Sequence, residues 1–227
     1  VQSMVNKTMD KWGGVDILVN NAGILRDKTF LKMSVEDMRE VIDVHLMGSL
    51  NCSKAAWETM REQSYGRIVL TSSSSGLYGN FGQTNYGAAK MAMVGIMNTL
   101  HLEGMKYNIK VNCLAPTAGT AMTDGLFPEP VFKLMPPESV SPGVVFLCSK
   151  DAPSRKVLAA GGGSFAIFKG FETEGVNLLP DELSAEGVAK YWDKIDGENN
   201  MQEPQSGSAQ SQKFAMQAAE KLGLDLS

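Results

Sequence analysis

Cysteine and histidine are scarce in this chain, and their scarcity restricts the chemistry available to it. The 227 residues include three cysteines and two histidines. Cys52, Cys113 and Cys148 are widely spaced within apolar segments, which favours buried free thiols in a reducing compartment over disulfides. His45 and His101 belong to no CxxC or HExxH motif. The sequence therefore predicts no metal site.

Long apolar runs and basic clusters are also absent. No stretch approaches the roughly 18 continuous apolar residues that a membrane span requires. The formal net charge is -4 at pH 7 and charges of both signs are interspersed, which argues against a nucleic-acid surface. We expect neither a nucleic acid nor a membrane as a partner. The length fits one domain of ordinary size with a packed core.

A tyrosine and a lysine stand four residues apart in the segment that carries the most chemical information. Tyr86 and Lys90 begin an Ala-rich stretch with the pattern of a helix, so both side chains leave one face. A nearby ammonium favours the phenolate, which would let the pair exchange protons near neutral pH. Ser73 follows the apolar run 67–71 and can hydrogen-bond a substrate oxygen. Taken alone, a Tyr-x-x-x-Lys pair is more often a solvated surface pair.

Three further motifs accompany this pair. The apolar run 15–19 leads into Asn-Asn-Ala-Gly at 20–23, Ser73 lies at the matching distance before Tyr86, and a strand-like run ends in Ala-Pro at 115–116. Together they resemble the short-chain dehydrogenase/reductase family over residues 1 to about 170. The resemblance implies an α/β protein with a Rossmann-like, doubly wound parallel sheet. We expect strands near 16–20, 67–71, 110–114 and 164–168, linked right-handedly with helices on both faces.

The resemblance also implies a role for each residue of the motifs. Tyr86 is the expected general base, Lys90 is expected to lower its pKa and hold the nicotinamide ribose, and Ser73 to orient the reacting oxygen. His45 stands where most relatives have an asparagine that supports a water relay; a satisfied core histidine and a functional one are both open. The expected cofactor-binding residues are Asn20, Ala22, Gly23, Tyr86, Lys90, Pro116 and Thr120, the last of which is one residue short of the family spacing.

Local runs narrow the resemblance within the family. The runs 20–28, 44–48, 114–123 and 185–195 resemble the (3R)-hydroxyacyl-CoA dehydrogenase module of peroxisomal multifunctional enzymes and its bacterial relatives. This implies NAD-dependent oxidation of a (3R)-3-hydroxyacyl-CoA, with an acyl-CoA-like substrate and with NADP left open. It also implies a homodimer or homotetramer through the two long helices, in the cytoplasm or, in a eukaryote, the peroxisomal matrix. The alternatives are a 3-oxoacyl reductase or other alcohol dehydrogenase, and a non-catalytic assembly module.

The glycine-rich phosphate loop with which such domains begin is not found in this sequence. Gly161 to Gly163 precede a strand-like run instead of opening a helix, so we reject them as that loop. We therefore expect an N-terminally truncated domain whose run 15–19 lies at a sheet edge. The chain alone is then expected to be inactive, poorly soluble and unable to bind NAD below millimolar concentration.

The remaining patterns predict the domain limits and the helices. Residues 1–195 form the expected dehydrogenase domain, and 196–227 a polar linker followed by a short terminal helix at 213–222. Ser34 is expected to cap a helical stretch that ends near residue 63, and the helix of Tyr86 to end near residue 107. Further predicted features are an opening helix at 1–12, a lid-like segment at 127–137 with four prolines, and helices at 141–147 and 184–195.

Overall fold

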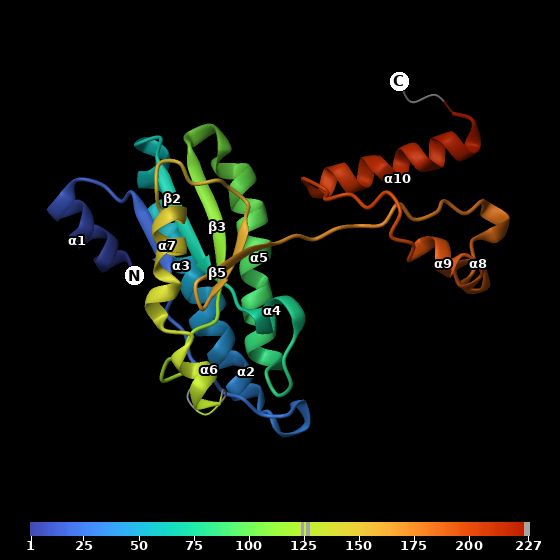
Figure 1. Ribbon diagram of the computed structural model, residues 1–227. Coiled ribbons are helices and arrows are strands. Elements are labelled where there is room, and N and C mark those ends of the chain that lie inside the picture. The colour runs from blue at the N-terminus through green and yellow to red at the C-terminus, as the bar shows by residue number, and fades with distance from the viewer. Residues whose placement is uncertain (124, 126–127, 225–227) are drawn as a thin grey trace. The chain divides into compact units, whose positions relative to one another are not determined.

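The computed structural model describes residues 1–123, 125 and 128–224, and divides the chain into two compact units. Unit 1 is Val1–Phe168 and unit 2 is Lys169–Ser227. Figure 1 shows the sheet and most of the helices in unit 1, and short helices together with a longer C-terminal helix in unit 2. The functional boundary that we predict after residue 195 falls inside unit 2 and stays a prediction.

Unit 1 is organised around a five-stranded sheet with the spatial order β1-β2-β3-β4-β5. Strands β1 (Ile17–Asn20), β2 (Gly66–Thr71), β3 (Ile109–Pro116) and β4 (Val157–Gly161) pair in parallel, while β5 (Ser164–Phe168) runs antiparallel to β4. Helical segments connect the parallel strands, as parallel pairing requires. The predicted Rossmann-like parallel sheet is confirmed.

The alternation of side chains along β2 explains how both faces of the sheet are covered. Ile68 and Leu70 point into a large apolar cluster that includes side chains of α3 (Gly48–Glu62) and α5 (Thr84–Gly104). Val69 points into a second cluster with Leu147 of α7 (Ser141–Leu147). All six residues of β2 are buried, as in a parallel strand covered on both faces.

The two outer strands differ from the sequence-based expectation. The fourth parallel strand is β4, which was not among the predicted strands. The predicted strand 164–168 is present, but as β5, which is antiparallel to β4. Gly162 and Gly163 form the two-residue turn between them, with φ of 56° and 80°, which suits a hairpin and not a phosphate loop. At the other edge of the described sheet lies β1, as expected for the run 15–19, and its Ile17 and Val19 are 48% and 41% exposed. β1 pairs only with β2 among the described strands.

The helical stretch after β1 places the first functional side chain. Ser34 accepts a hydrogen bond from the Asp37 amide and so caps α2 (Val35–Ile42), as predicted. The helix continues through a single π-helical turn, η2 (Asp43–Met47), into α3. Such π-turns are frequent at functional sites, and His45 lies within this one.

The other described helices of unit 1 are α1 (Gln2–Trp12), η1 (Phe30–Lys32), α4 (Ser74–Tyr78), η3 (Met105–Tyr107), α6 (Glu129–Lys133) and η4 (Pro137–Ser139). The opening helix α1 was predicted, and η3 continues α5 to the expected end near residue 107, whereas η1, α4, α6 and η4 were not predicted. Gly13, at φ 75°, ends α1. Within the predicted lid segment 127–137, Phe127 lies outside the described residues. Cys52, Cys113 and Cys148 are free thiols, of which only Cys113 is fully buried.

Unit 2 consists of η5 (Pro180–Glu182), α8 (Ala185–Lys190), α9 (Trp192–Ile195) and α10 (Gly207–Leu222). The last helix begins six residues earlier than the predicted Lys213, because Ser206 caps it by accepting from the Ala209 amide. None of the helices in the described part of the chain combines the length and apolar character needed to cross a membrane.

Candidate active site

A cavity of about 720 Å³ lies where β1, β2 and β3 end at their carboxyl termini. This is the edge of a parallel sheet at which ligands of open α/β folds bind, and the volume is that of a small-molecule site. The cavity is lined by seven of the predicted site residues, namely Gly23, His45, Ser73, Tyr86, Lys90, Pro116 and Thr120.

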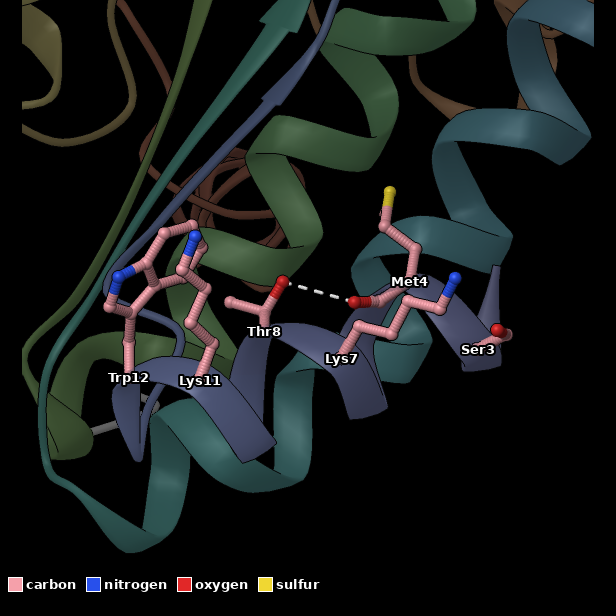
Figure 2. Close-up of a pocket in the computed structure, with 6 residues that line it drawn as sticks. All are labelled: Ser3, Met4, Lys7, Thr8, Lys11 and Trp12. Carbon is pink, nitrogen blue, oxygen red and sulfur yellow. Dashed lines mark hydrogen bonds between the residues drawn. The ribbon is translucent and has the colours of Figure 1, made fainter.

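A second hollow, on the outer surface of α1, has a different character. Its lining residues, from Ser3 to Trp12, all come from this one helix (Figure 2). Thr8 donates a hydrogen bond to the Met4 carbonyl within the helix, and the Lys11 ammonium lies 4.9 Å from the Trp12 ring centroid. No polar groups from separate elements converge there, so the first cavity is the candidate active site.

Two helices place the Ser, Tyr and Lys of the first cavity. Ser73 caps α4 by accepting from the Ser75 amide, and Tyr86 and Lys90 lie in α5. The Lys90 Nζ lies 5.5 Å from the Tyr86 ring centroid and donates to the Thr71 carbonyl at 2.7 Å. A Cβ on Gly76 would lie 2.8 Å from the Lys90 Cβ, so this glycine is what lets α4 approach α5 closely.

The pKa values of the pair differ from the sequence-based expectation. Burial, above all, raises the pKa of Tyr86; a hydrogen bond with Ser73 lowers it and the charge of Asp27 raises it further. The Lys90 ammonium lies over the Tyr86 ring and donates to the Thr71 carbonyl. Burial lowers the pKa of Lys90 to about 8. Of the two groups, the lysine is therefore the one whose pKa moves toward neutral pH.

His45 belongs to the site by position. Its ring packs edge-on against Tyr86, with centroids 5.2 Å apart. Its Nε2 lies 2.8 Å from the carbonyl oxygen of Ile24 and 3.1 Å from the Ile24 amide nitrogen. Its Nδ1 is buried without a hydrogen-bond partner among the described residues. Burial first, and the charge of Lys90, lower the pKa of His45, whereas the hydrogen bond with Ile24 raises it. In a neutral ring, an Nε2 that donates to the Ile24 carbonyl leaves Nδ1 as an acceptor, and an Nε2 that accepts from the Ile24 amide leaves Nδ1 as a donor.

The turn after β1 is shaped around this ring. A Cβ on Gly23 would lie 2.3 Å from His45 Cε1, which real structures do not tolerate, so the turn requires glycine here. Asn20 does not line the cavity, because its amide donates to Ser53 of α3 at 3.3 Å, and Ala22 does not line it either. The cofactor contacts expected for these two residues stay a prediction. The neighbouring Asn21 does line the cavity and accepts from the Thr71 hydroxyl at 3.2 Å.

Other lining residues had no predicted role. They include Tyr78 at the end of α4, Asn80 between α4 and α5, Gln83 just before α5, and Thr117 and Thr123 after β3. Thr123 donates to the Ala118 carbonyl at 2.7 Å and so closes the loop that presents Thr120. The signal available for the first three was their position inside the stretch 72–90, which already carried the motif.

The residues present fit the nicotinamide end of a dinucleotide. The cavity offers a buried amine on Lys90, a buried and unpartnered imidazole nitrogen on His45 and a turn at Gly23 that has no space for a side chain. Lys90 and Thr120 would hold such a group, and Gly23 and Pro116 would contact it.

A parallel α/β sheet that carries serine, tyrosine and lysine at the carboxyl ends of its strands defines an oxidoreductase of the Rossmann-like class. The sequence matches the short chain dehydrogenase family over residues 1–130, and the chain belongs to that family, whose members typically bind NAD or NADP.

Individual relatives agree with this assignment. The chain is 47% identical over 194 residues to a Mycobacterium tuberculosis protein named as a short-chain type dehydrogenase/reductase, covering 85% of this chain and 68% of the relative. It is 41% identical over 208 residues to mouse peroxisomal multifunctional enzyme type 2, covering 90% of this chain and 28% of that enzyme. The solved full-length enzyme of that name from Drosophila melanogaster superposes with a TM-score of 0.81 at 36% identity, covering 90% of this chain and 38% of the other.

Proposed function

We propose that this chain oxidises (3R)-3-hydroxyacyl-CoA to 3-oxoacyl-CoA with NAD. The observation that carries the proposal is the convergence of Ser73, Tyr86 and Lys90 on one cavity. The similarity to peroxisomal multifunctional enzymes type 2, which extends over 90% of this chain in the mouse relative, supports the hydroxyacyl-CoA substrate. Because the chain spans 28% of that relative, the activity of the whole enzyme is carried over only as a proposal.

In the proposed reaction each side chain handles one part of the substrate. Ser73 bonds the 3-hydroxyl oxygen and orients it, and Tyr86 takes the hydroxyl proton as general base. Lys90 holds the nicotinamide ribose with its ammonium, which also favours the phenolate once it turns from the Thr71 carbonyl toward the phenol. NAD, when bound, supplies the hydride acceptor.

His45 has a proposed place in the proton path. Its Nδ1 is buried without a hydrogen-bond partner among the described residues, and its ring contacts Tyr86 and lies close enough to Lys90 for the lysine charge to lower its pKa. We assign His45 the support of a water or an ammonium proton between Tyr86 and Lys90. A neutral imidazole can accept at Nδ1 while its Nε2 stays bound to Ile24.

A second candidate is the reverse chemistry, reduction of a 3-oxoacyl thioester. The raised pKa of Tyr86 favours the protonated phenol, which is the acid that a reduction requires. Relatives of this chain also include a 3-oxoacyl-[acyl-carrier-protein] reductase of Synechocystis and an acetoacetyl-CoA reductase of Rhizobium meliloti.

The deciding experiment is a set of assays on the complete natural protein. Each enantiomer of a 3-hydroxyacyl-CoA is offered with NAD and with NADP, and 3-oxoacyl-CoA is offered with NADH and with NADPH. The proposal predicts the highest kcat/KM for the (3R) substrate with NAD. A higher value for reduction with NADPH would support the reductase, and the absence of all six activities would support a non-catalytic module.

A further inference from the structure

The loop after β1 is fastened to the start of α5 at three points. The Lys28 amide donates to the Gly82 carbonyl at 2.9 Å, and the Asn85 side-chain amide donates to the Arg26 carbonyl at 3.1 Å. Between them, Gln83 Nε2 donates to Asp27 Oδ2 at 2.6 Å. This last contact joins two side chains that are 56 residues apart in sequence.

Both the nitrogen and the oxygen of the Gln83 side-chain amide are hydrogen-bonded. Its side chain is 6% exposed, and its Oε1 accepts from the Asn80 amide at 3.1 Å. Gln83 immediately precedes α5, yet its side chain does not cap the helix, because it is directed to Asp27. Asn85, the next fastened residue, accepts from the Tyr86 amide at 2.8 Å. The backbone that carries Tyr86 is thus held against the loop of Asp27.

Asp27 differs in its partners from the other charged residues of the loop near Tyr86. On the side of α5 and η2, Tyr86 faces the Lys90 ammonium and the His45 ring. On the loop side, Arg26 pairs with Glu40 and Lys28 with Asp37, each at 2.8 Å. Asp27 forms no ion pair among the described residues, and its partner there is the neutral amide of Gln83.

We propose that Asp27 is a positioning residue for Tyr86, whose carboxylate holds Gln83 at the start of α5 and whose negative charge adds to burial in favouring the protonated phenol. In agreement with this, the charge of Asp27 raises the pKa of Tyr86. The kinetic consequence rests on the proposed function of Tyr86: Asp27 disfavours the base needed for oxidation and favours the acid needed for reduction. Because Asp27 is exposed, salt screens the effect of its charge on Tyr86. The geometry of its hydrogen bond with Gln83 does not depend on salt in this way.

The first test is Asp27→Asn in the complete natural protein. An asparagine can still accept from Gln83 through its amide oxygen, so only the charge is lost. Oxidation needs the deprotonated phenol, so kcat/KM rises with pH through the pKa of Tyr86, and this rise is expected at lower pH in the variant. The difference is expected to shrink at high salt. The matched control is Asp16→Asn, since Asp16 also contacts a glutamine amide, that of Gln63 at 3.4 Å, but at the amino end of β1. It is expected to leave the profile unchanged.

The second test removes the clamp and keeps the charge. Gln83→Met has a similar volume but no donor, and a kcat/KM loss of about tenfold is expected, because misplacing a reacting group by about 1 Å can cost up to a hundredfold. The pH at which kcat/KM rises is expected to stay that of the wild type, unlike the lower pH expected for Asp27→Asn. Both variants are checked for a wild-type melting transition.

A readout that needs no activity separates this inference from the proposed function. The ultraviolet difference between wild type and Tyr86→Phe isolates the ionisation of one of the five tyrosines. Ionisation of Tyr86 at lower pH in Asp27→Asn supports the inference even if no acyl-CoA is a substrate. An unchanged titration, together with an unchanged pH profile wherever activity is found, would overturn it.

Discussion

The two units of the chain differ in what they bury. Unit 1 encloses two apolar clusters, and it also buries the side chains of Arg67, His45 and Lys90. Among the described residues of unit 2, only Gly187 and Ala219 are buried, while Trp192 and Phe214 are 56% and 50% exposed. A polar group acquires a shifted pKa mainly where a core removes it from water. The chemistry of this chain is therefore expected in unit 1.

The largest effect on stability is expected at Arg67, which is 1% exposed. Its guanidinium donates to the carbonyls of Asn108, Ser149 and Lys150 at 2.8 to 3.1 Å and so joins three segments. Arg67→Ala leaves these acceptors unsatisfied and opens a cavity, which should lower the free energy of unfolding by at least about 3 kcal/mol in urea titrations. The control, Arg61→Ala, removes an exposed arginine and should cost less than about 1 kcal/mol. Equal losses would contradict the described burial.

Lys90 should make stability depend on pH. Its pKa falls from 10.5 to about 8 on folding, so between these values the unfolded chain binds more protons than the folded one. Stability then rises with pH across this window, by up to about 3 kcal/mol from this group. Urea titrations at about pH 7 and about pH 10 measure the rise, and Lys90→Met should lack this part of it. The same rise in the variant would show that other groups cause it.

Gly23 tests the packing of the turn against His45. Gly23→Ala places a Cβ 2.3 Å from the ring, so either the turn or the imidazole must move. We expect a loss of about 1 to 3 kcal/mol in stability, as for other overpacked sites, together with a large fall in kcat/KM. Gly95→Ala is the control, since nothing lies within 4 Å of its Cβ in α5 and it should be neutral or stabilising. A neutral Gly23→Ala would contradict the close contact.

The smallest effect is expected in unit 2. Trp192→Ala removes a large side chain that is 56% exposed, so it should change the free energy of unfolding by less than about 1 kcal/mol. In unit 1, Met93→Ala, at 1% exposed, should cost about 2 to 5 kcal/mol. Similar costs for the two substitutions would break the contrast between the units.

Local sequence patterns predicted most of the fold and the central residues of the site. The apolar runs of β2 and β3, the Ser34 cap and the Tyr86–Lys90 spacing are all readable over a few residues. β4 was missed because Val157–Gly161 is short and ends in small residues, so its place depends on pairing with β3. The contact of Asp27 with Gln83 and the raised pKa of Tyr86 depend on distant segments and on burial. No local spacing encodes these properties.

The central claim, that the chemistry resides at Tyr86 of unit 1, is tested most directly by comparing two tyrosine substitutions in the complete natural protein. Tyr191, in unit 2, also bonds a polar group, the Glu182 carboxylate at 2.6 Å. The measured quantity is kcat/KM for the (3R)-3-hydroxyacyl-CoA with NAD. The account predicts that Tyr86→Phe lowers it by at least about a hundredfold while Tyr191→Phe leaves it within about twofold. Retention of more than about a tenth of the activity in Tyr86→Phe, a loss below about 1.4 kcal/mol, would contradict the account.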